Sequence, residues 1–187
     1  MNQKTVLRAR RILQTDPLFF DTETTGLDRF AEIVEIGVVD AAGRTLLSSL
    51  VRPKRRIPAD ATSVHGITND MVSDAPTWPE IWPQVKHLFA DRRVGIFNAD
   101  FDLRMMRQSH ARHDLSWEEM GGRAFCVMKM YARYYAELLG IGDIKWQSLQ
   151  KAGQQCGIAL PNSHRAVDDA RLASAVFRHM AGPEDSP

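Results

Sequence analysis

The stretch PLFFDTETTG, residues 17–26, places two carboxylates directly after a run of large apolar side chains. A run of Leu and Phe that ends near a Gly is typical of a buried β-strand. Side chains at i and i+2 of a strand point to the same face, so Asp21 and Glu23 converge at the end of that strand. Two like charges in a low-dielectric place are costly unless a cation lies between them. Oxygen ligands without Cys or His beside them favour Mg²⁺ or Mn²⁺ over zinc.

Further acidic segments are needed to support this interpretation, because an isolated Asp-x-Glu can also mark a strand that simply ends in a polar turn. Residues 94–102 read VGIFNADFD, a short apolar strand that runs into an acidic helix start. Residues 164–170 read HRAVDDA and lie near the end of the chain. Acidic side chains thus recur at three separate places in the sequence.

The motifs Asp-x-Glu-Thr-Thr-Gly, Asn-x-x-Phe-Asp and His-x-Ala-x-x-Asp, in this order, resemble those of the DEDDh (DnaQ-like) family of 3′→5′ exonucleases. VHGIT, residues 64–68, is similar to the family's loop between its first two motifs. The resemblance covers roughly residues 18–180. DTETTG and CVMKM, residues 126–130, look closer to the polymerase III epsilon catalytic domain and exonuclease X than to oligoribonuclease.

Helical geometry distinguishes Asp169 from its neighbour Asp168 without reference to any family. At ~100° per residue, Ala173, Val176 and Met180 fall on the side of Asp169, whereas Asp168 lies ~100° away. A carboxylate on the core-facing side of a helix needs compensation, which a metal supplies; a buried Arg is the alternative. The motif selects the same residue, so Asp169 is the predicted ligand.

The second motif offers two candidates, Asp100 and Asp102. An Asp at a strand-to-helix junction is usually an N-cap, a role that fits Asp100. Asp102 matches the family ligand and shares a helix face with Met105, Met106 and Ser109, a partly apolar surface that an unpaired carboxylate would avoid. We therefore expect Asp102 to be the ligand, and Asp100 either to cap the helix or to add negative charge near a second metal.

The resemblance implies that Asp21, Glu23, Asp102 and Asp169 hold two Mg²⁺ ions, for which Mn²⁺ can substitute. Such a two-metal site suits phosphodiester hydrolysis. It also implies that His164 is the general base, because a free imidazole titrates near neutrality and can take a proton from the attacking water. A Tyr at this position would mark the sister DEDDy subgroup.

Substrate contacts are predicted at five residues, with local structure as the alternative explanation for each. Gly26 lets the backbone approach a nucleotide closely, Leu27 looks like the family's apolar wedge against the terminal base, and Phe101 can stack on a base. His65, with Asp60 upstream, resembles the position that meets the sugar of the terminal nucleotide.

The resemblance implies an RNase H-like α/β fold, from which the strand order is taken. Apolar runs predict strands at 17–23, 33–40, 45–51, 94–97 and 124–127, and short connections make the first three antiparallel. Helices are expected at 78–90 behind an N-cap at Thr77, and at 100–110, 128–139, 146–156 and 166–180. The expected architecture is a mixed five-stranded sheet, three antiparallel strands followed by β-α-β, flanked by helices.

The chain divides into three predicted parts. Residues 1–16 form a basic N-terminal extension that we expect to be helical, 17–181 the exonuclease domain, and 182–187 a disordered polar tail. No polymerase-tethering segment is visible after the last helix, so we expect the domain to act without a polymerase subunit. The sequence does not indicate an oligomeric state.

Composition limits the class of protein. A net charge of +1 and 44% hydrophobic residues fit a globular domain and lack the basic excess of proteins that grip duplex DNA along its length. Basic residues do gather at 52–56 and 104–112, where they either contact phosphate or are solvated. No run approaches ~20 apolar residues, so no membrane span is expected. Two cysteines, Cys126 and Cys156, suggest a reducing, cytoplasmic location.

The expected activity is metal-dependent release of nucleoside 5′-monophosphates from 3′ ends of DNA, with single-stranded or frayed ends preferred, as in repair or replication proofreading. An RNA 3′→5′ exonuclease of the same family is the alternative, because a contact to the 2′-hydroxyl decides between DNA and RNA. A non-catalytic nucleic-acid-binding module is a remoter alternative.

Overall fold

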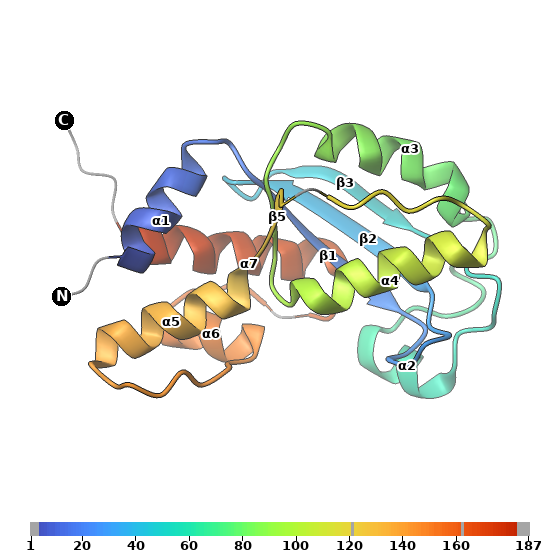
Figure 1. Ribbon diagram of the computed structural model, residues 1–187. Helices are drawn as coiled ribbons and strands as arrows, with labels where there is room; N and C mark the ends of the chain where they lie inside the picture. The colour runs from blue at the N-terminus through green and yellow to red at the C-terminus, as the bar shows by residue number, and fades with distance from the viewer. Residues whose placement is uncertain (1–3, 121, 162, 183–187) are drawn as a thin grey trace.

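A mixed five-stranded sheet forms the centre of the protein in the computed structural model, which describes residues 4–120, 122–161 and 163–182 (Figure 1). Its strand order is β3-β2-β1-β4-β5, with β1, β2 and β3 antiparallel and β4 and β5 parallel to β1. The strands are β1 (Leu18–Thr24), β2 (Ile33–Asp40), β3 (Thr45–Leu50), β4 (Val94–Ile96) and β5 (Ala124–Cys126). The predicted sheet is confirmed, and every strand boundary lies within one residue of its predicted position.

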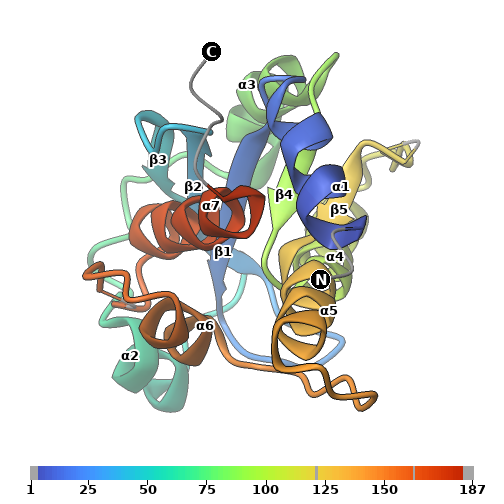
Figure 2. The ribbon, with the colours of Figure 1, turned by 90° about the vertical axis from the view of Figure 1, so that its left-hand side faces the viewer.

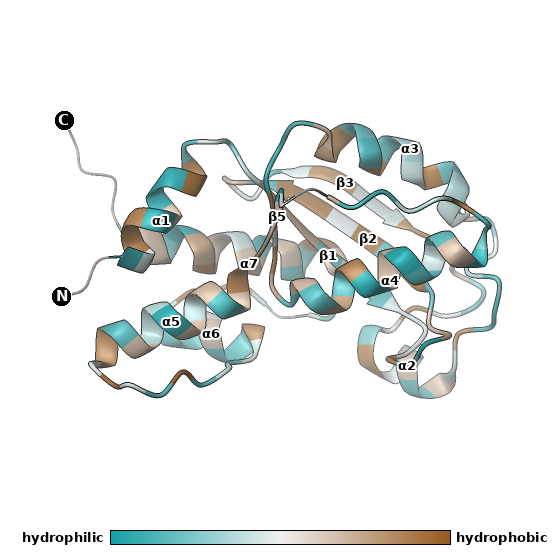
Figure 3. Ribbon diagram, viewed as in Figure 1, coloured by the Kyte–Doolittle hydropathy of each residue, from teal (hydrophilic) through white to brown (hydrophobic). Residues whose placement is uncertain are grey.

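Helices cover both faces of the sheet. One face packs against α1 (Lys4–Leu13), α5 (Val127–Leu139), α6 (Leu149–Gln155) and α7 (Ala166–Ala181). The other packs against α3 (Trp78–Phe89) and α4 (Ala99–Arg112), while α2 (Ala59–His65) covers a smaller apolar cluster. Figure 3 shows apolar residues concentrated on the strands and polar residues prominent on α4. Among the described helices, none is long and apolar enough to span a membrane.

The N-terminal helix contributes to the core. Ala9 and Ile12 are buried against the cluster that includes α7, and Arg10 Nε donates to the carbonyl of Ala181 at 2.8 Å. Figures 1 and 2 show α1 beside the C-terminal end of α7. Helix α1 occupies residues 4–13 of the predicted N-terminal extension. Residues 1–3 and 183–187, which include nearly all of the predicted disordered tail, lie outside the described part of the chain.

The alternation of β1 decides which side chains face each layer. Leu18 and Phe20 pack in the cluster with α3 and α4, whereas Phe19 packs in the cluster with α7. Because side chains alternate along a strand, Asp21 and Glu23 follow Phe19 to the α7 side. The intervening Thr22 instead faces α4.

Helix α7 crosses β2 at Gly37. A Cβ at this position would lie 2.4 Å from both the carbonyl carbon of Ala166 and the nitrogen of Val167, closer than any real contact. Only glycine therefore lets the first turn of α7 lie directly on the strand. This close approach brings Asp169, which is 6% exposed, over the end of β1.

Two helix starts show how local capping sets the boundaries. The predicted N-cap Thr77 is confirmed, and its N–H donates to Glu80 Oε2 at 2.7 Å. The helix predicted to begin at residue 146 begins at Leu149, because the Ser148 hydroxyl accepts from the N–H of Lys151 and caps it there. Trp146 consequently lies outside the helix and is 60% exposed.

Candidate metal centre

The centre is built at the C-terminal end of β1. Asp21 and Glu23 lie opposite Gly37 and Glu35 of β2 in the antiparallel register. Both carboxylates are partly buried between the sheet and α7. The i, i+2 spacing in the sequence therefore produces the convergence that was predicted for this pair.

Asp102 reaches the same place from the first turn of α4. It is 3% exposed, and its Oδ1 accepts a hydrogen bond from the Thr22 hydroxyl at 2.8 Å. Thr22 faces away from its neighbours Asp21 and Glu23, so one short strand segment supplies two acids and orients a third. This function of Thr22 was not predicted.

Asp100 is not the helix cap that the sequence suggested. Helix α4 begins one residue earlier, at Ala99, with Asn98 as its N-cap. Asp100 thus lies in the first turn, exposed, and its Oδ2 is 2.6 Å from the Lys129 ammonium of α5. The acid two residues later is the one that turns inward.

The first turn of α7 supplies the last acid, Asp169, and the loop just before the helix supplies His164. Ligand atoms of Glu23, His164 and Asp169 all lie within 4.8 Å of one another. His164 is exposed and has a positive φ of 52°, a conformation that non-glycine residues seldom adopt. The neighbouring Asp168 instead accepts from Arg171 at 2.7 Å and from the Ser163 hydroxyl at 2.9 Å.

Glu35 is a fifth acid at the centre, and sequence reasoning missed it. It is 2% exposed, pairs with the guanidinium of Arg165 and accepts from the N–H of Ala166 at 2.9 Å. The carboxylate therefore holds the first turn of α7 onto β2. An acid inside the otherwise apolar run IVEIGVV, residues 33–39, was the signal that could have revealed it.

Burial raises the pKa of the clustered acids, and repulsion between neighbouring acids adds to this at Asp21 and Glu23. Burial, and then the charges of its acidic neighbours, raises the pKa of Asp21 well above its usual range. Burial first, then Asp169 and the other acids, raises the pKa of Glu23 to about 8, although the Arg165 charge opposes this. Burial raises the pKa of Asp102 to about 7 against the opposing hydrogen bond from Thr22.

This donor set fits hard divalent cations. The four predicted ligands offer only carboxylate oxygens, which Mg²⁺ and Mn²⁺ prefer. The repulsion that raises the pKa values of Asp21 and Glu23 is the cost that a bound cation would remove. The residues therefore fit the metal that the motifs suggested.

The loop after β1 presents two of the predicted substrate residues. Gly26 has a φ of 156°, and a Cβ there would meet open space. Leu27 is 76% exposed in the same loop. Phe101 is partly buried at the start of α4 beneath the Arg104 guanidinium, 5.3 Å from its ring centroid. Their contacts with substrate stay predictions.

His65 and Asp60 lie at the two ends of α2. His65 is 5% exposed, its Nδ1 accepts from the N–H of Ile67 at 3.0 Å, and its Nε2 lies 3.3 Å from the carbonyl of Thr24. Both ring nitrogens are thus engaged, and a sugar contact requires exchanging one of these bonds. Asp60 is exposed and accepts from the N–H of Ala61. Both substrate assignments stay predictions.

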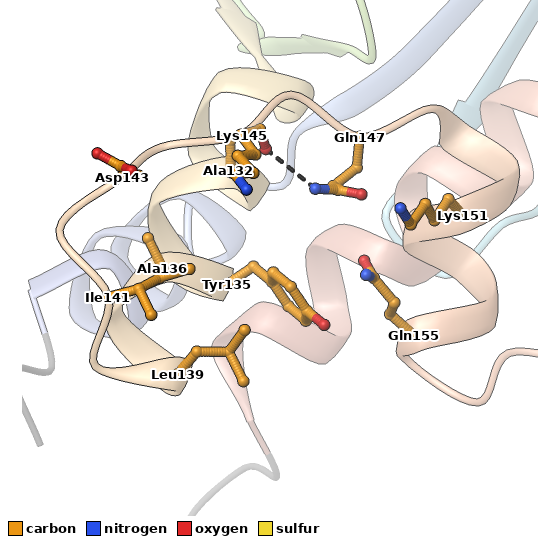
Figure 4. A pocket seen from close by; sticks show the side chains of 10 residues that line it. All are labelled: Ala132, Tyr135, Ala136, Leu139, Ile141, Asp143, Lys145, Gln147, Lys151 and Gln155. Atoms are coloured by element: carbon orange, nitrogen blue, oxygen red, sulfur yellow. Dashed lines mark hydrogen bonds between the residues drawn. The ribbon is translucent and has the colours of Figure 1, made fainter.

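A separate hollow of about 240 Å³ lies between α5, α6 and their connecting loop (Figure 4). Its wall combines apolar side chains of α5 with polar groups that include Lys145, Gln147 and Lys151. None of the four predicted metal ligands lines it, so this hollow is distinct from the acidic centre.

The sequence profile of the family described as "Exonuclease" matches residues 18–177, which contain the whole acidic centre and His164. The chain belongs to the DEDDh family of 3′→5′ exonucleases. This exonuclease is 39% identical over 179 residues to the "Uncharacterized exonuclease CP81" of Escherichia phage 186, covering 93% of this chain and 92% of that protein. It is 32% identical over 165 residues to DNA polymerase III subunit epsilon of Treponema pallidum (strain Nichols), covering 86% of this chain and 74% of that protein.

A solved structure of exonuclease X in complex with 5′ overhanging duplex DNA has a similar fold. The TM-score is 0.66 at 29% identity, over 91% of this exonuclease and 93% of that chain. The likeness confirms the RNase H-like fold expected from the motifs. Enzymes of this family use divalent metal ions, in agreement with the acidic donor set.

Proposed function

We propose that this exonuclease removes nucleoside 5′-monophosphates from 3′ ends of DNA, with single-stranded or frayed ends preferred. The observation that carries the proposal is the convergence of Asp21, Glu23, Asp102 and Asp169 beside His164. Likeness to a polymerase III epsilon subunit, and to exonuclease X bound to DNA, supports DNA as the substrate. An exoribonuclease is the alternative, and the experiment below separates the two.

The four carboxylates would hold two divalent cations, Mg²⁺ with Mn²⁺ as a substitute. Bound there, the cations would neutralise phosphate charge and acidify the attacking water. Asp21, Glu23 and Asp169 would supply ligands for one ion, and Asp102, with Asp21, for the other. Thr22 orients Asp102 for this, and Glu35 holds the helix that carries Asp169.

His164 would accept the proton of the attacking water. Its ring belongs to the cluster with Glu23 and Asp169, and its exposed position lets the proton pass on to solvent. The left-handed backbone at this residue places the side chain before the first turn of α7 rather than on the helix. Such placement of a base is expected to contribute ~10²–10⁴ in rate.

Leu27 would separate the terminal base from its neighbour. An exposed apolar side chain next to the acidic centre can replace the stacking partner of the final base, and unstacking costs a few kcal/mol when the end is paired. Frayed ends would then react faster. We also propose a reducing, cytoplasmic location, which the free cysteines Cys126 and Cys156 support.

Digestion of matched labelled substrates, with the label at the 5′ end of linear molecules and inside the circular one, tests the proposal. Single-stranded DNA, blunt duplex DNA, RNA of the same sequence and circular single-stranded DNA are incubated with Mg²⁺, and with EDTA as control. A ladder shortening from the 3′ end, fastest on single-stranded DNA and absent in EDTA, is expected. Faster digestion of RNA than of DNA would identify the enzyme as an exoribonuclease. Cutting of the circular DNA would identify it as an endonuclease.

A further inference from the structure

Three arginines gather on one exposed aromatic ring in the loop between β1 and β2. Phe30 is 42% exposed, and the guanidinium carbons of Arg29, Arg55 and Arg112 lie 4.6, 5.6 and 5.4 Å from its ring centroid. A ring face attracts a cation by ~0.5–1 kcal/mol at exposed sites, which only partly offsets the repulsion among three. We call these residues, with Lys54, the Phe30 basic surface.

Helix α4 holds this surface beside the acidic centre. Arg104 donates to the carbonyl of Leu27 at 3.1 Å, Gln108 to that of Ala31 at 3.0 Å, and Arg112 to that of Phe30 at 3.3 Å. The spacing of four residues places the three donors on one helix face, spread over ~12 Å of rise. Arg104, which contacts Leu27, is close to Asp102 on α4, whereas Arg112 lies at the far end of the helix. The exposed Leu27 is therefore nearer the acidic centre than the Phe30 basic surface is.

The buried carboxylate of Glu32 holds the backbone of Lys54 and Arg55 in this surface. Glu32 is 2% exposed and accepts from the backbone N–H groups of Lys54 and Arg55 at 3.0 and 3.1 Å. The Lys54 ammonium contacts the carbonyl of Arg112 at the end of α4. Burial first, and then the Lys54 charge, lowers the pKa of the adjacent His113, while the charges of Glu32 and Asp114 oppose this shift.

The charges of the Phe30 basic surface are available to an external anion. Within the described residues, Arg29, Lys54, Arg55 and Arg112 form no ion pair with a carboxylate. Two carboxylates lie near these charges and accept from backbone N–H groups instead: Asp28 Oδ1 from that of Phe30 at 2.6 Å, and Glu32 from those of Lys54 and Arg55. Guanidinium groups suit phosphates because their planar donors match phosphate oxygens in pairs.

We propose that the Phe30 basic surface binds phosphates of the complementary strand when the enzyme engages a duplex. The inference rests on the proposed function, because the cleaved strand must enter the acidic centre. Leu27 stands between that centre and the basic surface, so a strand parted from its partner there passes on the Phe30 side. The surface would thus hold duplex ends in place while the last pair opens.

Binding measured without hydrolysis tests this inference independently of the activity. The probes are a 5′-fluorescent single strand and the same strand in a duplex with a 5′ overhang, both ending in phosphorothioate linkages. The variants are Arg55→Ala and the double variant Arg55→Ala/Arg112→Ala, with the exposed Arg178→Ala of α7 as matched control. Thermal unfolding verifies that each variant is folded.

We expect the double variant to weaken duplex affinity by ~5–20-fold at ~0.1 M salt, with the salt slope reduced by about 1 for each lost contact. Single-strand affinity should change less than about twofold, and Arg178→Ala should leave both unchanged. Equal loss on both probes would assign the surface to the cleaved strand, and no loss on the duplex would exclude it from DNA binding; either overturns the proposal. Failure of the proposed function would appear separately, as absent digestion by the unmodified enzyme.

Discussion

Glu35 of β2 and Arg165 at the N-cap of α7 form a bidentate ion pair, with Arg165 Nε and Nη2 at 3.0 and 2.5 Å from Glu35 Oε1. The Glu35 side chain is 3% exposed, whereas that of Arg165 is 43% exposed. Glu35 also lies directly opposite Glu23 in the sheet register. The Glu35 carboxylate thus links β2 to α7, the helix that carries Asp169 of the acidic centre.

Glu35→Gln is expected to lower kcat by ~10-fold or more with little change in KM, because Glu35 acts through the placement of α7 rather than through substrate. An amide can still accept from the N–H of Ala166 but leaves Arg165 without its charge partner, so stability should fall by roughly 1–3 kcal/mol. Arg165→Gln should behave similarly. The double variant should be little worse than either single variant, since one interaction is removed in all three. Fully additive losses in kcat would show that the two residues act separately.

Asp169→Ala should abolish hydrolysis while Asp168→Ala remains active. Asp169 is buried at the acidic centre, whereas Asp168 is paired with Arg171 at the surface. Removing a carboxylate from the cluster also relieves repulsion, so metal-free Asp169→Ala should unfold at the same temperature as the unmodified protein or higher. Rates on single-stranded DNA and thermal melts in EDTA provide the measurement. Activity in Asp169→Ala with a dead Asp168→Ala would reverse the assignment.

His164→Ala should lose ~10²–10⁴ in rate, the range expected when a general base is removed. The rate of the unmodified enzyme should rise with pH and then level off, and the variant should lose that rise. Mg²⁺ affinity, measured by calorimetry, should change little because the carboxylates remain. A variant with an unaltered pH profile would assign the base to another group.

Metal-free protein should become less stable as pH rises from about 5 to about 8. The pKa values of Glu23 and Asp102 rise from usual values of 4.5 and 3.8 to about 8 and about 7 on folding. In that interval the folded state binds more protons than the unfolded state, so the free energy of unfolding falls as pH increases. Thermal melts in EDTA should show this trend, Mg²⁺ should reduce it, and Glu23→Gln should weaken it. A melting temperature that increases over the same interval in EDTA would contradict the raised pKa values.

Leu27→Ala should slow digestion of paired ends more than digestion of single strands. The exposed side chain is proposed to part the last base from its neighbour, a step that single strands need less. Rates on a single strand, a blunt duplex and a duplex with a mismatched 3′ end provide the comparison, with the exposed Leu138→Ala as a surface control. Equal slowing on all three substrates would place Leu27 in general binding rather than in strand separation.

Apolar periodicity predicted where the strands and helices lie, whereas the strand order was taken from the family resemblance. Strand and helix geometry fix where side chains point. The i, i+2 spacing therefore predicted that Asp21 and Glu23 share a face, and the helical phase predicted that Asp169 faces the core. Two helix starts shifted: α6 begins behind the Ser148 cap, three residues later than predicted, and α4 begins behind Asn98, one residue earlier. The motifs then identified the family, which the comparisons confirmed.

Tertiary structure decided what holds the acids together. Thr22 orients Asp102, and Glu35 anchors Arg165, across separations of 80 and 130 residues. The Phe30 basic surface likewise combines the β1–β2 loop, the loop after β3 and the end of α4. No local pattern encodes such contacts, because they depend on how separate elements pack, and packing is set by the whole core at once. Sequence specified the groups that do the chemistry, and only the packed structure showed which residues position them.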